Sequence, residues 1–204
     1  SEFELGTELR LFSSKIGLDI SYFDRNDSDI PVLVPLDGST GYSSIIVNSG
    51  KQTSSGIEIA LLGDVIDGTD FKWQLGVNFA TFTKFVDALY EGIDTRNLST
   101  YTSNMNLQER VGEEWGALYG RGFTYDASGN MLFKASSNGN YYYSRTANKY
   151  LGNLLPDYTG GVTSNMSYKN LDLTLGFDFQ SGGKYYSRTE RYYDHSGLSE
   201  YTAG

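Results

Sequence analysis

The chain has 204 residues, of which 39% are hydrophobic and 15% aromatic, with 24 glycines, 3 prolines and no cysteine. Its net charge of −9 excludes a nucleic-acid binder that neutralises phosphates, and the lack of cysteine excludes disulfides, thiolate metal sites and cysteine nucleophiles. No apolar run approaches eighteen residues, which excludes a transmembrane helix but not membrane-spanning strands. A composition rich in tyrosine and glycine and poor in proline favours many strands.

The first predicted element is a β-hairpin at residues 2–23, and a long link at residues 24–54 follows it. Phe3, Leu5 and Leu9 share one face of its first strand, opposite a face that carries charged residues. The same alternation predicts a second hairpin at residues 55–82, followed by a link at residues 83–157. A third hairpin at residues 158–180 ends in the unbroken alternation LDLTLGFDFQ, and residues 181–204 form the last link.

The connections between these strands are alternately short and long. The turns within the three hairpins lie at residues 13–15, 63–70 and 169–170, and we expect Asn170 to adopt the positive φ of a tight turn. In the second link we predict a small hairpin at residues 122–134 with its turn at residues 126–130, and we do not count it as spanning a membrane. Short turns at one end and long loops at the other are typical of outer-membrane barrels.

The six predicted strands have about nine to eleven residues each, the length that a tilted strand needs to cross a bilayer. Six strands do not close a barrel, because the smallest single-chain barrels have about eight and an open edge is costly in hydrocarbon. We therefore predict an all-β fold, an antiparallel transmembrane β-barrel segment with about six spanning strands of a large outer-membrane barrel. The rival is a soluble or surface-attached β-sandwich that binds carbohydrate, which does not explain the alternating connection lengths.

Several stretches together resemble a SusC/RagA-type TonB-linked outer-membrane receptor from the Bacteroidota. They are FELGTELRLF, VPLDGSTGYSSIIVNSGKQTSSGIEIAL, FKWQLGVNFA, VGEEWGALYGRGF and KYLGNLLPDYTGGVTSNMSYKNLDLTLGFDFQSGGKYYS, in that order along the chain. The match is to the later part of the barrel. We expect a partial barrel domain at residues 1–204, because the plug domain, the signal peptide and the TonB-contacting segment of the family are not in it and the terminal aromatic strand is replaced by Thr202, Ala203 and Gly204.

The resemblance implies an active transporter in the outer membrane of a Gram-negative bacterium, crossing it several times. It would import a large nutrient, an oligosaccharide or a peptide. The implied partners are a SusD-like surface lipoprotein, TonB through the N-terminal part, and outer-membrane lipid; nucleic acid is not a partner. No cofactor is implied. We expect no enzymatic activity, because His195 is the single histidine, no G-x-S-x-G turn is present, and the adjacent Glu113 and Glu114 would point to opposite sides of a strand.

Charged residues on the polar faces of the predicted strands would face the lumen of such a barrel. Lumen lining that contacts the plug is the functional interpretation, and a generic water-facing wall is the plainer one. These residues are Glu4, Glu8, Arg10, Asp19, Glu58, Lys72, Asp172 and Asp178.

Tyrosines in the predicted extracellular loops are the candidate ligand-binding residues, because a tyrosine stacks its apolar ring and hydrogen-bonds through its hydroxyl. The plainer interpretation is an aromatic girdle or packing between loops. The candidates are Tyr141, Tyr142, Tyr143, Tyr185, Tyr186, Tyr192 and Tyr193.

A weak calcium candidate lies just after the first hairpin. Asp24, Asn26 and Asp29, with Asp27 between them, offer oxygen ligands, but the pattern is not that of an EF-hand. Asp and Asn are also common where a strand ends in solvent, so we favour no metal at this position.

Overall fold

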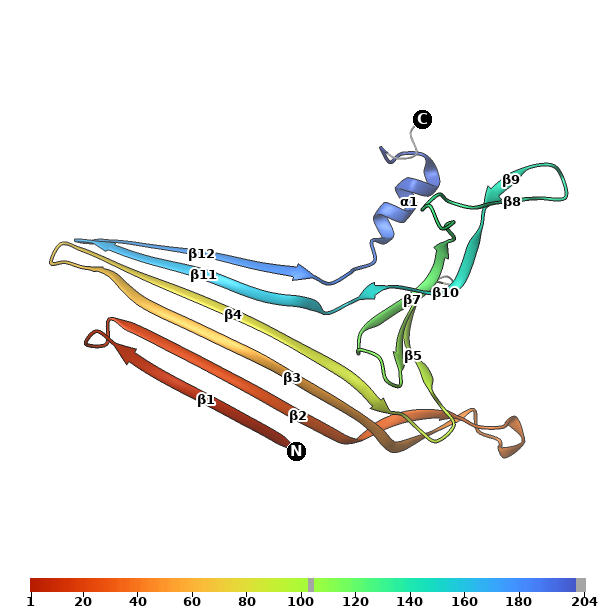
Figure 1. The fold of residues 1–204 in the computed structure, drawn as a ribbon, viewed down its shortest axis with the longest axis horizontal. Coiled ribbons are helices and arrows are strands. Elements are labelled where there is room, and N and C mark those ends of the chain that lie inside the picture. Colours follow the sequence, from red (N-terminus) through yellow and green to blue (C-terminus); the bar gives the residue numbers. More distant parts are fainter. Residues whose placement is uncertain (103–104, 201–204) are drawn as a thin grey trace.

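The computed structural model describes residues 1–102 and 105–200. Its main element is one antiparallel sheet of six strands in the order β1-β2-β3-β4-β11-β12. The strands are β1 (Glu2–Leu11), β2 (Ile16–Pro35), β3 (Ser44–Asp67), β4 (Phe71–Ala88), β11 (Pro156–Tyr168) and β12 (Leu171–Gly182). The prediction of six strands in three hairpins is confirmed, and within the described residues the sheet stays open (Figure 1).

The links between hairpins hold further structure. A second, four-stranded sheet has the order β10-β7-β6-β5, and β8 pairs with β9. These elements are β5 (Thr95–Thr102), β6 (Met105–Arg110), β7 (Ala117–Phe123), β8 (Phe133–Ala135), β9 (Tyr141–Tyr143) and β10 (Arg145–Asn153), with a 3-10 helix at Gly38–Thr40 and the helix α1 at Arg188–Ser196. Figure 1 shows the second sheet, the β8–β9 hairpin and α1 at the end of the large sheet opposite its three tight turns.

The first link is shorter than the sequence predicts, because β2 and β3 continue far into it. Only residues 36–43 connect the two strands, instead of residues 24–54. Val32 pairs with Val47 and Val34 with Ile45, so a β-branched ladder carries the strands onward. Pro31 lies where the β2–β3 register shifts, between Ile30 and Pro31, and a bulge tolerates a residue that has no backbone N–H to donate.

Two of the predicted turns differ in detail from the structure. β3 keeps its strand conformation to Asp67, so the second turn spans residues 68–70 rather than 63–70. In the third turn the positive φ belongs to Lys169, at 51°, and not to Asn170. In a two-residue hairpin turn of type II′ only the first central residue needs a positive φ, and Lys169 occupies that position.

The second link contains the predicted small hairpin as part of a larger unit. Tyr125 bridges Met131, and the Asp126 backbone N–H donates to the Asn130 carbonyl oxygen, so the turn at residues 126–130 is confirmed. The other strands of the second sheet were not predicted. A small core lies at the extensions of β2 and β4 and contains buried Val32, Val34, Val86 and Leu89, against which Trp115 of the β6–β7 turn packs.

The large sheet is a single layer. The strongest contacts between its strands are those between hydrogen-bonded neighbours, and no second sheet covers its apolar face in the described part of the chain. This arrangement contradicts the rival β-sandwich, whose two sheets would pack face to face. Among residues 1–102 and 105–200, no helix has the length and apolar content to cross a membrane.

Candidate functional site

The register of the large sheet gathers all eight residues predicted to face a lumen on one of its two faces. Glu8 pairs with Asp19, Ser21 with Glu58, and Ser167 with both Lys72 and Asp172, and directly paired residues share a face. The remaining members follow from the alternation along each strand. The eight are Glu4, Glu8, Arg10, Asp19, Glu58, Lys72, Asp172 and Asp178. Their shared face is a structural finding, whereas their lining of a lumen stays a prediction.

Four of these carboxylates surround one hollow in the polar face. Glu4, Glu8, Asp19 and Glu58 line a depression of about 700 Å³, together with Asn78. Glu8 and Asp19 are directly opposed like charges, and Arg10 on the same face forms an ion pair with Glu8. The hollow therefore carries excess negative charge, which attracts cationic groups of any molecule that lies against this wall.

The opposite face of the sheet is apolar and uncovered. Leu5 on β1 and Phe177 on β12 are each 65% exposed, and these two strands lie at opposite edges of the sheet, so the exposed apolar surface reaches from one edge to the other. Soluble proteins rarely expose a continuous apolar surface of this extent to water. The residues of this face include Phe3, Leu5, Leu9, Leu11, Ile57, Leu61, Leu173, Leu175, Phe177 and Phe179, all exposed by at least 40%.

The predicted ligand-binding tyrosines fall into two separate groups. Tyr141, Tyr142 and Tyr143 form β9 and are exposed, whereas Tyr192 and Tyr193 lie on α1. The first group is therefore part of the β8–β9 hairpin. The structure brings neither group onto the polar face of the large sheet, and ligand contact by either stays a prediction.

The second group lies on the helix α1 and just before it, in a segment that the sequence predicts as a loop. Tyr185 is 87% exposed, while the half-buried Tyr186 has its ring centroid 6.4 Å from that of Tyr101. The α1 helix begins after Ser187, whose hydroxyl oxygen accepts the Glu190 backbone N–H at 3.1 Å. Serine followed three residues later by glutamate is the capping-box pattern, a signal that the sequence contained. Residues 201–204 of the predicted last loop lie outside the described residues.

The weak calcium candidate is a bulge in a strand. β2 shifts register between Asp27 and Ile30, and Asp29 has a φ of 60°, a conformation that aspartate tolerates. The Asn26 side-chain amide donates to Asp24 Oδ1 at 3.2 Å, so it presents a donor there rather than a metal ligand. In the described part of the chain, no three His, Asp or Glu side chains are placed to hold a metal ion.

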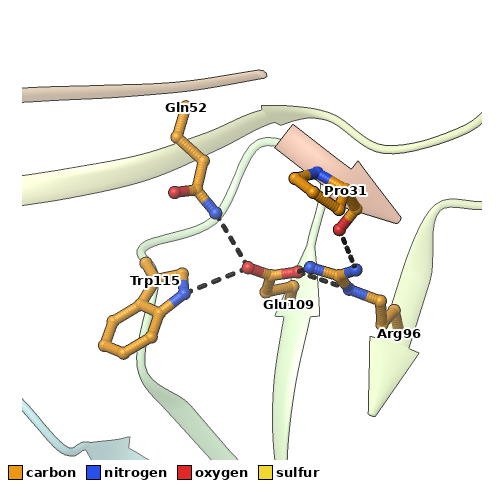
Figure 2. A network of polar contacts seen from close by, with 5 residues as sticks. All are labelled: Pro31, Gln52, Arg96, Glu109 and Trp115. Carbon is orange, nitrogen blue, oxygen red and sulfur yellow. Dashed lines mark hydrogen bonds and ion pairs between the residues drawn. The ribbon is translucent and has the colours of Figure 1, made fainter. Parts of the chain in front are cut away.

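A buried ionic network that the sequence did not reveal joins the two sheets. Glu109 on β6 is 1% exposed, and its Oε1 accepts hydrogen bonds from Gln52 Nε2 at 2.8 Å and Trp115 Nε1 at 3.0 Å (Figure 2). Its Oε2 accepts from Arg96 Nε at 2.7 Å, and Arg96 Nη1 also donates to the Pro31 carbonyl oxygen at 3.0 Å. These contacts connect β2 and β3 of the large sheet to β5 and β6 of the second.

A second polar cluster lies at the β6–β7 turn. The Tyr119 hydroxyl donates to a Glu113 carboxylate oxygen, and the Arg110 guanidinium lies 3.3 Å from the centroid of the Tyr119 ring. Glu113 and Glu114 therefore have different partners, since Glu114 accepts from Asn153 Nδ2 at 3.3 Å. His195 is exposed in the last turn of α1, and nothing in these contacts aligns it with a nucleophile.

The Tyr119 cluster makes a testable prediction about pH. Burial, and then the hydrogen bond to Glu113, raise the pKa of Tyr119 from 10.0 to about 12. Because the folded pKa is above the unfolded value, the stabilisation is fully present below pH 10.0 and is lost as the pH rises toward about 12. We expect the difference in tyrosinate absorbance between the native protein and Tyr119→Phe to titrate near a pKa of about 12 rather than 10.0. A difference that titrates with the exposed tyrosines would contradict the hydrogen bond.

Comparisons with known proteins agree with this geometry. A family model described as "TonB dependent receptor-like, beta-barrel" matches residues 1–203. TonB-dependent receptor P3 of Formosa agariphila is 28% identical over 203 residues, which cover 90% of this chain and 20% of the relative. A solved structure of the RagAB peptide transporter is similar in fold, with a TM-score of 0.67 and 18% identity over 89% of this chain and 21% of that chain. The chain thus spans about a fifth of the length of the relatives that it matches.

Proposed function

Because the chain belongs to the TonB-dependent receptor β-barrel family, whose members are multi-pass barrels of the Gram-negative outer membrane, we propose that it forms wall and outer loops of an active nutrient importer. The resemblance to SusC/RagA-type receptors is confirmed, and the relatives compared above are named receptors or transporters rather than enzymes. The imported nutrient in this proposal is large, an oligosaccharide or a peptide.

The observation that carries the proposal is the pair of unlike faces on one single-layer sheet. The apolar face has the residues that a lipid-facing wall needs, and the polar face has the carboxylates of a water-filled interior. Neither face is covered by another sheet within the described residues. In an outer-membrane barrel the apolar face contacts lipid and the polar face contacts water, so each face lies in a suitable environment.

The proposed domain division follows the same geometry. The membrane-spanning parts are the hairpins at about residues 2–23, 55–82 and 158–180, and the extracellular parts are about residues 24–54, 83–157 and 181–204. The second sheet, the β8–β9 hairpin and α1 belong to the extracellular parts in this scheme, which agrees with their common end in Figure 1.

In the proposed mechanism this chain helps to bind the nutrient and to guide it into the lumen, and it catalyses no reaction. Extracellular loops and a SusD-like surface lipoprotein capture the nutrient, and TonB acts on a plug supplied by other parts of the receptor to open the lumen. Tyr185, Tyr192 and Tyr193 are proposed nutrient contacts, because they are exposed beside the outer end of the wall. The acidic hollow at Glu4 and Glu58 favours nutrients or plug surfaces with cationic groups.

Uptake by cells tests this proposal. We expect cells with the intact receptor to import fluorescently labelled oligosaccharides or peptides, and cells without the receptor or without TonB to lose that uptake. The control is a labelled disaccharide small enough for general porins, whose entry should not change in either strain. Uptake of the whole panel that is independent of both receptor and TonB would overturn the proposal.

A further inference from the structure

The β8–β9 hairpin presents large aromatic rings on one of its faces. Its register pairs Phe133 with Tyr143 and Ala135 with Tyr141, so these side chains lie on the same side. The Tyr143 ring centroid is 4.8 Å from that of Phe133 and 5.3 Å from that of Phe123 on β7. We call Phe123, Phe133, Tyr141 and Tyr143 the aromatic face.

This face is exposed. Phe133 is 58% exposed, Tyr141 is 76% and Tyr143 is 44%, while Met131 and Leu132 beside them are each 42% exposed. An exposed apolar cluster of this kind marks a contact surface, and aromatic residues and methionine are enriched in protein–protein interfaces. Only two of the four rings of the aromatic face, those of Tyr141 and Tyr143, carry a hydroxyl, and phenylalanine, leucine and methionine side chains supply no hydrogen-bonding group, so most of this surface suits apolar contact.

The charge around the aromatic face is opposite to that of the whole chain. Residues 117–153 contain four cationic side chains and the single carboxylate of Asp126, although the chain has a net charge of −9. The Arg145 guanidinium lies 5.4 Å from the centroid of the Phe123 ring, and Lys149 Nζ lies 5.1 Å from that of the Tyr125 ring. The aromatic face is therefore bordered by cations, and a complementary partner has an apolar patch bordered by carboxylates.

We propose that the aromatic face is the docking surface for the surface lipoprotein of the importer, which presents an apolar patch rimmed by carboxylates. This inference rests on the proposed function, and it assigns Tyr141 and Tyr143 to the partner rather than to the nutrient. The hairpin lies at the outer end of the wall in Figure 1, the end that a surface lipoprotein can reach. Apolar contact supplies the affinity, and Arg145 and Lys149 supply orientation and a faster association rate.

Binding of the purified lipoprotein to the purified full-length receptor in nanodiscs tests the docking surface. Tyr141→Ser should raise the Kd about tenfold or more, because this ring is exposed and its loss leaves the hairpin packing in place. Tyr142→Ser is the matched control. Tyr142 is also exposed and lies on the same strand, but its register partner is Lys134, so it occupies the other face, and we expect its Kd within about twofold of wild type.

Charge reversal gives a second readout that does not depend on the rings. Arg145→Glu should weaken binding more at low salt than at high salt, while Lys134→Glu on the other face should change the Kd little. Equal effects of Tyr141→Ser and Tyr142→Ser, or no effect of either, would overturn the docking surface even if nutrient uptake still needs the lipoprotein. A wild-type receptor that does not bind the lipoprotein also overturns it, and the TonB-dependence of uptake then decides the proposed function separately. If Tyr141→Ser weakens binding of a labelled oligosaccharide instead, the face is a nutrient site.

Discussion

Replacing Leu175 by arginine is expected to destabilise the full-length receptor in lipid vesicles by roughly 2–4 kcal/mol, the cost of a cation at the bilayer midplane on a lipid-facing strand. Leu175 lies near the middle of β12 and belongs to the apolar face, where it is 40% exposed in the sheet alone. Urea unfolding of the vesicle-embedded receptor measures the effect. The size of the change depends on depth, so a large value also places Leu175 near the centre of the membrane.

The neighbouring residue Thr174 is the control, because consecutive side chains of a strand point to opposite faces of the sheet. Thr174 faces the polar side, and its hydroxyl donates to Asn165 Oδ1 at 3.0 Å. Thr174→Arg should cost about 1 kcal/mol or less, the value of one neutral hydrogen bond, since water solvates the new guanidinium. Equal costs at the two positions, or a larger cost at Thr174, would show that the faces are assigned the wrong way round or that β12 does not span the membrane.

The large sheet was predictable because its physics is local and periodic. Alternation such as LDLTLGFDFQ indicates that one face of a strand is apolar and the other polar, and β1, β4 and β12 show it clearly. The ends of β2 and β3 were less predictable. Asp27, Asp29 and Pro31 suggest that the chain leaves the strand, yet the register shifts between Asp27 and Pro31 accommodate both Asp29 and Pro31 within β2. The β-branched residues Val32 and Val34 were the local indication that β2 continues beyond Pro31.

The second sheet has no such periodic signal, because it is buried in patches rather than on one face. In β6, consecutive residues Leu107, Gln108 and Glu109 are all buried, so polar and apolar side chains do not alternate. A glutamate in a sequence predicts exposure unless its partners are known. Gln52 lies 57 residues away along the chain, and Arg96 meets Glu109 only because β5 and β6 pair in a register that the sequence did not predict. The α1 helix differs, since its capping box is local and was available from Ser187 and Glu190.

Glu109→Leu is expected to lower the local unfolding free energy of the second sheet by about 3–5 kcal/mol, the cost of removing one partner from a buried ion pair. The Arg96 side chain is 16% exposed, so its guanidinium is left with little access to water, and the acceptor that remains to it among the described residues is the Pro31 carbonyl. The amide of Gln52 and the indole N–H of Trp115 lose the same acceptor oxygen. Hydrogen exchange of the β5 and β6 amides in the full-length receptor measures this, because it reports the opening of one region rather than of the barrel.

A double replacement separates the charge effect from a packing effect. If the unpaired guanidinium is the cause, Arg96→Leu combined with Glu109→Leu should recover much of the lost protection, since apolar side chains can replace a buried ion pair at little cost. Glu91→Leu at an exposed position in the same link is the control and should leave β5 and β6 exchange unchanged. Unaltered exchange in Glu109→Leu would mean that the network does not hold the second sheet to the wall. The loops would then move independently of β2 and β3, and a lipoprotein docked on the hairpin would not be held in a fixed position above the lumen.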